Sequence, residues 1–404
     1  MNILMLSVTY PYPPSLGGTE VRTFNLLKAL RQHHDVTLFS LQHPGIPEAD
    51  IHALKNYVTE LKLFPAPSND YSRSPVSKAL RFGRFLWDGV PASTRHRHTA
   101  AIQAWMDEQA KSGRFDAITC EHSANEIFVS PTVQAHIPCR VVDIHSSVYG
   151  TCKQQLDTGT AENPLRERLN LALLKRYERQ YCGKFTDLVV TTPDDADQIR
   201  ELRPDRRVHV VTNGVDLAEF PLRSQDPGGH DLVFVGAMDT PANVDAAVFF
   251  SREVLPLLRD RYPDATVYLV GTRPTPPVLA LQETPGVVVT GKVPSTVDYL
   301  HRAAVGVVPL RIGYGIKNKT LEAMAAGVPV VASDRGLEGL AVDGEGVPLR
   351  ALRANDPQAF VAAISQLFEN PDLRATLSRH ARTMIEAEFT WESAGTRYHQ
   401  VITG

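Results

Sequence analysis

Short apolar runs rich in β-branched residues alternate with longer amphipathic stretches, and this alternation restricts the fold more than any other feature. The runs are continuously apolar, which is typical of strands buried on both faces and therefore of a parallel sheet. Alternation of strand and helix predicts a doubly wound α/β arrangement. The first half has predicted strands at 2–8, 35–41, 115–121, 139–146, 187–192 and 208–214, and a predicted helix over 19–30.

The pattern is interrupted once and then starts again. Residues 221–231, PLRSQDPGGHD, are polar, rich in proline and glycine and without periodicity, so this stretch is predicted to be a linker. Beyond it lie predicted strands at 232–238, 266–271, 286–291, 305–310 and 328–333, and predicted helices near 243–260, 295–303, 318–326 and 356–368. We therefore predict two Rossmann-like domains, 1–220 and 232–389, that face each other across a cleft. The helical stretch 390–404 is expected to pack back on the first domain.

Composition limits the partners that this chain can have. The formal net charge of −3 gives no global field that favours nucleic acid, so any basic site must be local. The four cysteines are scattered without a CxxC pair, which argues against a disulfide scaffold or zinc site and suits a reducing, cytoplasmic compartment. The apolar start, MNILMLSV, is too short for a signal peptide, and no run reaches the ~20 apolar residues of a membrane span.

One loop concentrates positive charge where a helix is predicted to begin. Arg311 opens the stretch RIGYGIKNKTLEAM, and Gly315 gives its backbone the freedom to turn. The first amides of the following helix would face an anion, and Lys317 and Lys319 add charge. Three cations suit a diphosphate better than a carboxylate, and Glu322 is predicted to accept hydrogen bonds from a ribose. The alternative is a solvated basic loop in which Glu322 balances Lys319 along the helix.

Four further residues lie at or just after predicted strand ends. Gly17 and Gly18 form a glycine turn between the first strand and the first helix, which suits an anion but is also an ordinary turn. His145 lies at the carboxyl end of the predicted strand 139–146, at the depth of the expected cleft. A lone histidine is usually structural, but this position also suits a functional role. His122, at the end of the preceding strand, is a weaker candidate.

In combination, these motifs resemble those of the retaining, nucleotide-sugar-dependent glycosyltransferases of family four, which have the GT-B fold. The resemblance runs from PYPPSLGGTEVRTFNLLKAL through VVTNGVDLAEF and GIKNKTLEAMAAGVPVVASDRGLEGL to FTWESAGTRY. It implies an acceptor site on the N-terminal domain and a nucleotide-sugar site on the C-terminal domain. It also implies sugar transfer to a hydroxyl of a glycan or lipid-linked acceptor with retention of configuration, without a bound metal or cofactor.

The resemblance also assigns roles to individual residues. Gly17 and Gly18 match the loop that approaches the donor phosphates, and His145 matches the histidine beside the transferred sugar. Glu322 matches the second glutamate of the E-x7-E pattern, which is expected on the ribose. Val293, in the segment GKV, matches the segment that brackets the base.

Two departures from the family pattern affect the donor site. Tyr314 stands where the first glutamate of E-x7-E is expected, so the contacts to the donor sugar are open. The segment 235–247, VGAMDTPANVDAA, lacks the arginine and lysine that usually stabilise the leaving diphosphate. We therefore predict that Lys317 and Lys319, helped by Arg311, take over this catalytic role. Both lysine side chains are expected to be partly exposed, with Lys319 the more important.

The segment 77–98 is predicted to be a basic, aromatic surface helix. It interleaves Arg81 and Arg84 with Phe85 and Trp87. Such a helix is typical of contact with anionic lipid, which would place the protein at the inner face of the membrane. An ordinary amphipathic helix over the core is the alternative.

Two other functions remain open at this stage. A nucleotide-sugar 2-epimerase of the same fold would need acid and base carboxylates in the cleft. A non-catalytic nucleotide-binding or scaffold module would keep the fold without turnover. Incubation with nucleotide sugars separates them, because slow donor hydrolysis indicates a transferase and interconversion of sugars indicates an epimerase.

Overall fold

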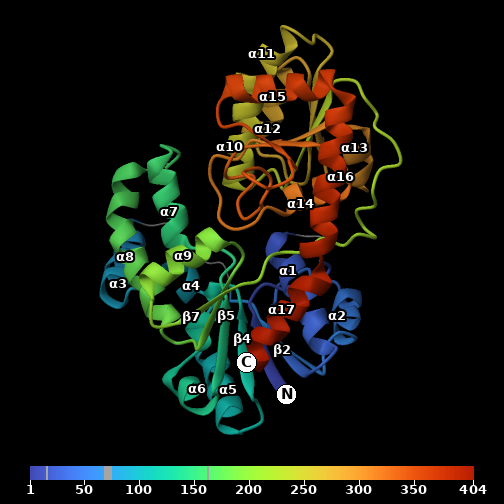
Figure 1. The fold of residues 1–404 in the computed structure, drawn as a ribbon. Coiled ribbons are helices and arrows are strands. Elements are labelled where there is room, and N and C mark those ends of the chain that lie inside the picture. The colour runs from blue at the N-terminus through green and yellow to red at the C-terminus, as the bar shows by residue number, and fades with distance from the viewer. Residues whose placement is uncertain (15–16, 68–74, 162) are drawn as a thin grey trace. The chain divides into compact units, whose positions relative to one another are not determined.

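The computed structural model describes residues 1–14, 17–67, 75–161 and 163–404, which form two compact units (Figure 1). The N-terminal unit consists of Met1–Thr212 and Ala394–Gly404, and the C-terminal unit consists of Asn213–Ser393. Helix α17 (Trp391–Thr403) therefore ends within the N-terminal unit, beside α1 (Gly18–Arg31). The two helices approach closely, because a Cβ at Gly395 would lie only 2.4 Å from the Cβ of Ala29.

In the described part of the chain, the N-terminal unit is built on one seven-stranded sheet. The strand order is β3-β2-β1-β4-β5-β6-β7, and all neighbouring strands are parallel. The strands are β1 (Asn2–Ser7), β2 (Asp35–Gln42), β3 (Glu60–Pro65), β4 (Ala117–Glu121), β5 (Cys139–Asp143), β6 (Asp187–Val190) and β7 (Arg207–Val210). The helices besides α1 and α17 are α2 (Glu48–Lys55), α3 (Pro75–Asp88), α4 (Ala92–Arg95), α5 (Ala100–Lys111), η1 (Ser123–Phe128), α6 (Pro131–His136), α7 (Val148–Asp157), α8 (Pro164–Cys182) and α9 (Pro193–Leu202).

The C-terminal unit, which is described throughout, has a six-stranded sheet. Its strand order is β10-β9-β8-β11-β12-β13, and the strands are again parallel. The strands are β8 (Asp231–Val235), β9 (Thr266–Val270), β10 (Val287–Gly291), β11 (Val305–Val308), β12 (Val330–Ala332) and β13 (Leu352–Arg353). The helices are α10 (Pro241–Phe249), η2 (Phe250–Val254), α11 (Leu255–Arg259), α12 (Pro276–Leu279), η3 (Ala280–Glu283), α13 (Val297–Arg302), α14 (Asn318–Ala325), α15 (Pro357–Glu369) and α16 (Pro371–Glu388).

Each sheet reverses its winding at one point. In the N-terminal unit β1 and β4 are neighbours, and in the C-terminal unit β8 and β11 are neighbours. Ligands of open α/β sheets bind beyond the carboxyl ends of strands at such a point, because the loops there diverge to opposite faces. The topology therefore predicts ligand sites at the loops after β1 and β4 and at those after β8 and β11.

The predicted fold class, two Rossmann-like α/β sheets, is confirmed. Strand β3 is not predicted from the sequence, because it lies at the sheet edge with its inner residues only half-buried and gives a weak apolar pattern. The single helix predicted over 77–98 is wrong. Gly89 takes a left-handed φ of 73° and Pro91 precedes α4, so the segment divides into α3 and α4.

None of the helices within the described ranges is both long enough and apolar enough to cross a membrane.

Candidate functional site

Lys319 lies at the winding reversal of the C-terminal unit, in the first turn of α14. Its Nζ donates a hydrogen bond to Oδ1 of Asn243 on α10 and lies 4.9 Å from the centre of the Phe234 ring on β8. A Cβ at Gly236, just after β8, would approach this amine to 3.0 Å, so glycine leaves room for the lysine. Among the described residues Lys319 forms no ion pair with a carboxylate.

Lys319 and Glu322 both have strongly shifted pKa values. Burial lowers the pKa of Lys319 to about 7, although the nearby Glu322 carboxylate acts in the opposite direction. Burial also raises the pKa of Glu322 to about 7, against the opposing effect of Lys319. Groups with such perturbed pKa values are typical of functional sites. In the described structure the Glu322 carboxylate accepts no hydrogen bond, so its oxygens are available to a ligand.

The other two cations of this loop have carboxylate partners. Arg311 forms a bidentate ion pair with Asp245, with Nε 2.9 Å from Oδ2, and its guanidinium lies over the Phe249 ring. Lys317 lies 2.8 Å from Oε2 of Glu338 and also donates to the carbonyl of Gly315. The expectation that Lys317 is partly exposed is wrong, because it is buried in this ion pair at the start of α14.

Glycines shape the loop that leads into α14. Gly313 and Gly315 have φ values of 136° and 72°, a region that other residues rarely adopt. Val293 packs partly buried against the core of the C-terminal unit. The predicted roles of Gly315 at the phosphates and of Val293 at the base stay predictions.

Two glycines begin helix α1 of the N-terminal unit. Gly17 is the N-cap of α1, and Gly18 is the first residue of this helix. The backbone of Gly17 is extended, and a Cβ there would lie 2.8 Å from Oε2 of Glu20. Residues 15–16, which precede this turn, lie outside the described residues. The predicted approach of this loop to the donor phosphates stays a prediction.

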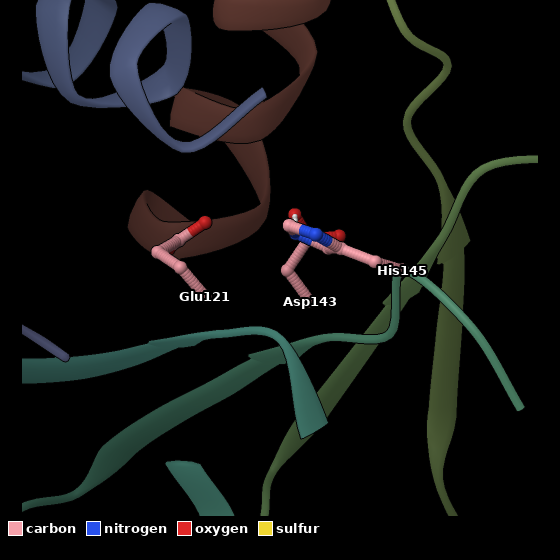
Figure 2. Close-up of side chains that lie close together, drawn as sticks. All are labelled: Glu121, Asp143 and His145. Carbon is pink, nitrogen blue, oxygen red and sulfur yellow. Dashed lines mark hydrogen bonds and ion pairs between the residues drawn. The ribbon is translucent and has the colours of Figure 1, made fainter. Parts of the chain in front are cut away.

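His145 forms part of a charged network at the end of β5 (Figure 2). Its Nε2–H donates to Oδ2 of Asp143 at 2.8 Å. Arg22 on α1 donates to the same carboxylate from Nε at 2.6 Å and from Nη2 at 2.8 Å. Burial acts to raise the pKa of Asp143, but Arg22 and His145 hold it well below its usual range. The ionised Asp143 therefore fixes the tautomer and orientation of His145.

Glu121, at the end of β4, lies beside Asp143 but is protonated at neutral pH. Burial, followed by the charge on Asp143, raises the pKa of Glu121 to about 8. Tyr398 of α17 donates to Oε1 of Glu121 at 2.7 Å, whereas Oε2 is buried without a hydrogen-bond partner. The C-terminal helix thus contributes a side chain to the network around Asp143.

Glu121, Asp143 and His145 offer ligand atoms within 4.8 Å of one another, which is close enough to share a metal ion (Figure 2). The donor set fits poorly, because both carboxylate oxygens of Asp143 already accept from Arg22. A metal ion would meet the guanidinium charge and a protonated Glu121. The cluster is better suited to hold Arg22 than a metal ion.

His122 directly follows β4 and has a left-handed backbone conformation, with a φ of 85°. This conformation is strained for a residue other than glycine. Burial, followed by the neighbouring His145, lowers the pKa of His122 to about 3, so the His122 ring is neutral. The Ala124 amide donates to Nδ1, which leaves the proton on Nε2, 3.4 Å from the Ser146 hydroxyl. Strain of this kind is retained where the surrounding structure needs the side chain in one place.

A cavity of about 800 Å³ adjoins the carboxyl ends of β1 and β2 in the N-terminal unit. Its lining combines rings and polar groups, among them Tyr10, Tyr12, His96 and Arg97. Aromatic faces beside polar side chains suit a sugar, which has both apolar C–H faces and hydroxyls.

The family model for Glycosyltransferase Family 4 matches residues 16–219, just over half of the chain. The chain belongs to glycosyltransferase family 4. A second model, Glycosyl transferases group 1, matches residues 229–370 of this family 4 glycosyltransferase.

Two sequence relatives of the family 4 glycosyltransferase are named enzymes. Glycogen synthase of Mycobacterium tuberculosis (strain CDC 1551 / Oshkosh) is 25% identical over 422 aligned residues, which cover 99% of this chain and 94% of the relative. Phosphatidyl-myo-inositol mannosyltransferase of Propionibacterium freudenreichii subsp. shermanii is 31% identical over 197 residues, which cover 46% of this chain and 48% of the relative.

Solved structures agree with the GT-B fold. Sucrose-phosphate synthase of Thermosynechococcus elongatus has a TM-score of 0.71 at 19% identity and covers 99% of this chain and 98% of its own. Anabaena HepE in complex with UDP has a TM-score of 0.68 at 14% identity, with full coverage of both chains. The family 4 enzyme is therefore a glycosyltransferase with the GT-B fold.

Sequence reasoning missed several residues of both sites in this family 4 enzyme. They are Arg22, Glu121, Asp143, Asn243, Glu338 and Tyr398. A single charged residue within an apolar strand, such as Glu121 or Asp143, is the signal that points to them. Their partners come from distant parts of the chain, which no local pattern reveals.

Proposed function

We propose that this enzyme transfers a sugar from a nucleoside diphosphate donor to a hydroxyl of a glycan or lipid-linked acceptor, with retention of configuration and without a metal ion. The observation that carries the proposal is Lys319, a half-buried lysine without a carboxylate partner among the described residues, at the first turn of α14 and the reversal point of the sheet. Glycogen synthase and the mannosyltransferase among the relatives support a role in polysaccharide or glycolipid synthesis.

The proposed chemistry needs no carboxylate pair. Negative charge develops on the β-phosphate oxygen as the bond to the sugar breaks, and Lys319 with the first amides of α14 would stabilise it. The acceptor hydroxyl attacks from the same face as the leaving phosphate, which takes its proton, so configuration is retained. His145, oriented by Asp143, would contact the transferred sugar.

UDP is the first donor nucleotide to test, because the HepE complex holds UDP. Incubation with a panel of UDP-, GDP-, ADP- and TDP-sugars, read by release of nucleotide, tests the proposal. Slow donor hydrolysis that an added glycan accelerates supports a transferase. Interconversion of the sugars without release would indicate the epimerase, and binding without turnover would indicate a non-catalytic member.

Two further features complete the proposal. All four cysteines are free thiols, which supports a cytoplasmic location.

The segment 77–98 would contact the membrane through α3, where Leu86 and Trp87 are 47% and 86% exposed. Phe85 is instead buried, and the side chain of Arg81 lies outside the described residues.

Replacement of Glu322 by alanine is expected to weaken nucleotide binding about tenfold or more, because the ribose would lose a charge-assisted acceptor worth roughly 1.5–3 kcal/mol. Calorimetric titration with UDP measures the change. Glu345→Ala, a change to an exposed acid in the same unit, serves as the control. Unchanged affinity in a folded Glu322→Ala variant would remove Glu322 from the nucleotide site.

Chelation is expected to leave turnover unchanged, since cationic and amide groups are proposed to stabilise the diphosphate. Initial rates of nucleotide release are compared before and after treatment with EDTA and removal of the chelator by gel filtration. Loss of activity that Mg²⁺ or Mn²⁺ restores would contradict the metal-independent mechanism.

Binding of UDP at about pH 8 is expected to take up a proton, because a diphosphate favours the charged form of an amine beside it. At this pH Glu322 is ionised and Lys319 is largely neutral, since the pKa of each is about 7. Affinity should then fall by up to about tenfold between pH 8 and 9. Calorimetry in two buffers of different protonation enthalpy measures the uptake. An uptake that persists in Lys319→Met would assign the proton to another group.

A further inference from the structure

Helix α8 carries a largely exposed surface that the glycosyltransferase chemistry does not use. Its buried residues, Tyr177, Glu178, Tyr181 and Cys182, all lie in the last two turns. Leu165 and Leu169, one turn apart, are 74% and 67% exposed. Large apolar side chains this exposed on one helix face are typical of an interaction surface.

A basic groove follows the two leucines along α8. It has a volume of about 510 Å³ and is lined by Ala172, Lys175, Arg176, Arg179, Gln180 and Arg203. Arg203 is paired with Asp205. In the described structure, Lys175, Arg176 and Arg179 form no ion pair with a carboxylate. Three cations without counter-charges attract an anionic partner.

The acidic residues of α8 do not offset this charge. Glu167 is paired with Arg166, 2.8 Å away. Glu178 points into the unit, where it accepts from the Ser147 hydroxyl at 2.7 Å and from the Tyr149 amide. The exposed face is therefore strongly basic although the whole chain has a net charge of −3.

Helix α3 lies beside this groove (Figure 1). A Cβ at Gly89, the residue after α3, would lie 3.1 Å from Oε1 of Gln180 and 3.9 Å from Nε of Arg176. On α3, Leu80 is 69% exposed and Trp87 is 86% exposed. The C-terminal end of α3, which carries Trp87, thus adjoins the cations of α8 in the N-terminal unit.

We propose that this α3–α8 surface docks on an anionic lipid bilayer. Leu165, Leu169 and Trp87 would enter the boundary between headgroups and acyl chains. The groove of Lys175, Arg176 and Arg179 would bind lipid phosphate. Exposed apolar residues next to cations match a bilayer, which supplies both environments, whereas a soluble polyanion supplies only the charge. The inference deepens the membrane contact proposed for 77–98 and is independent of the transfer chemistry.

Co-sedimentation of the full chain with vesicles tests the proposal. We expect binding to vesicles of phosphatidylglycerol and phosphatidylcholine, and little binding to phosphatidylcholine alone. Arg176→Glu/Arg179→Glu should weaken binding at least about tenfold, since each cation near an anionic surface contributes roughly a factor of five. Leu165→Ser/Leu169→Ser should weaken it as well. Arg252→Glu/Arg379→Glu, a charge reversal at exposed positions of the C-terminal unit, is the matched control.

The readouts separate the lipid from other anions. Hydrolysis of UDP-sugar should be unchanged in all variants, which shows that they are folded. If Arg176→Glu/Arg179→Glu is unstable, Arg176→Gln/Arg179→Gln replaces it. Equal vesicle binding by wild type and both α8 variants would overturn the proposal. It would also be overturned if heparin or inorganic phosphate binds to the groove while the leucine variant keeps full vesicle affinity, because the partner would then be a soluble anion.

Discussion

Replacement of Lys319 by alanine is expected to lower turnover by about 10²–10³, the effect of removing one well-placed electrostatic group from a developing anion. Lys319 is the one cation of the loop 311–319 that has no carboxylate partner among the described residues, since Arg311 pairs with Asp245 and Lys317 with Glu338. Charge on the diphosphate grows as the bond breaks. The loss should therefore fall more on kcat than on donor affinity.

Steady-state kinetics with the preferred UDP-sugar and calorimetry of UDP binding measure the two effects separately. Thermal unfolding should change little, because the free enzyme holds Lys319 at a lowered pKa and gains little from its charge. Arg379→Ala, which removes an exposed cation from α16, is the matched control. Turnover near the wild-type rate in a folded Lys319→Ala variant would show that other residues stabilise the leaving group.

Lys317→Ala should behave differently from Lys319→Ala. It leaves the buried Glu338 carboxylate with Arg335 as its ion-pair partner. The expected result is a lower free energy of unfolding. The value of kcat should fall only if the loop 311–317 shifts and displaces Lys319. The ion pair of Lys317 with Glu338 thus favours Lys319 over Lys317 as the group that acts on the leaving phosphate.

Replacement of Arg22 by methionine is expected to lower the free energy of unfolding of the N-terminal unit by about 3–5 kcal/mol, the usual effect of breaking one side of a buried ion pair. Arg22 is 1% exposed and donates two hydrogen bonds to Asp143. It also donates to the carbonyls of Val211 and Thr212, at 2.9 and 3.2 Å. One side chain therefore joins α1, the end of β5 and the segment after β7.

Urea unfolding followed by a probe in the N-terminal unit measures this change. Arg22→Met/Asp143→Leu should recover part of the loss, because no unpaired charge remains buried. Lys153→Met, which breaks an exposed ion pair with Asp157, should cost less than about 1 kcal/mol. If Arg22→Met were no more destabilising than Lys153→Met, the carboxylate of Asp143 would have to be neutral or hydrated in the folded protein.

The sequence by itself determined the fold class and the position of the candidate donor loop, 311–322. A continuously apolar strand such as 305–310 must be buried on both faces, as in a parallel sheet covered by helices on both sides. The local pattern therefore predicts the tertiary arrangement of this strand. The same reasoning placed Lys319 and Glu322 at the start of a helix, because glycines and charges at a strand end are local features.

Only the tertiary structure decided which charged groups are available to a ligand. Arg311, Lys317 and Lys319 look alike in the sequence, but Asp245 and Glu338 lie 66 and 21 residues from their partners and pair with two of the three. Likewise, Arg22, 121 residues away in the sequence, keeps Asp143 ionised, whereas burial and the charge on Asp143 keep Glu121 protonated. The charge of a buried group depends on its neighbours in space, and these are set by the packing of distant segments.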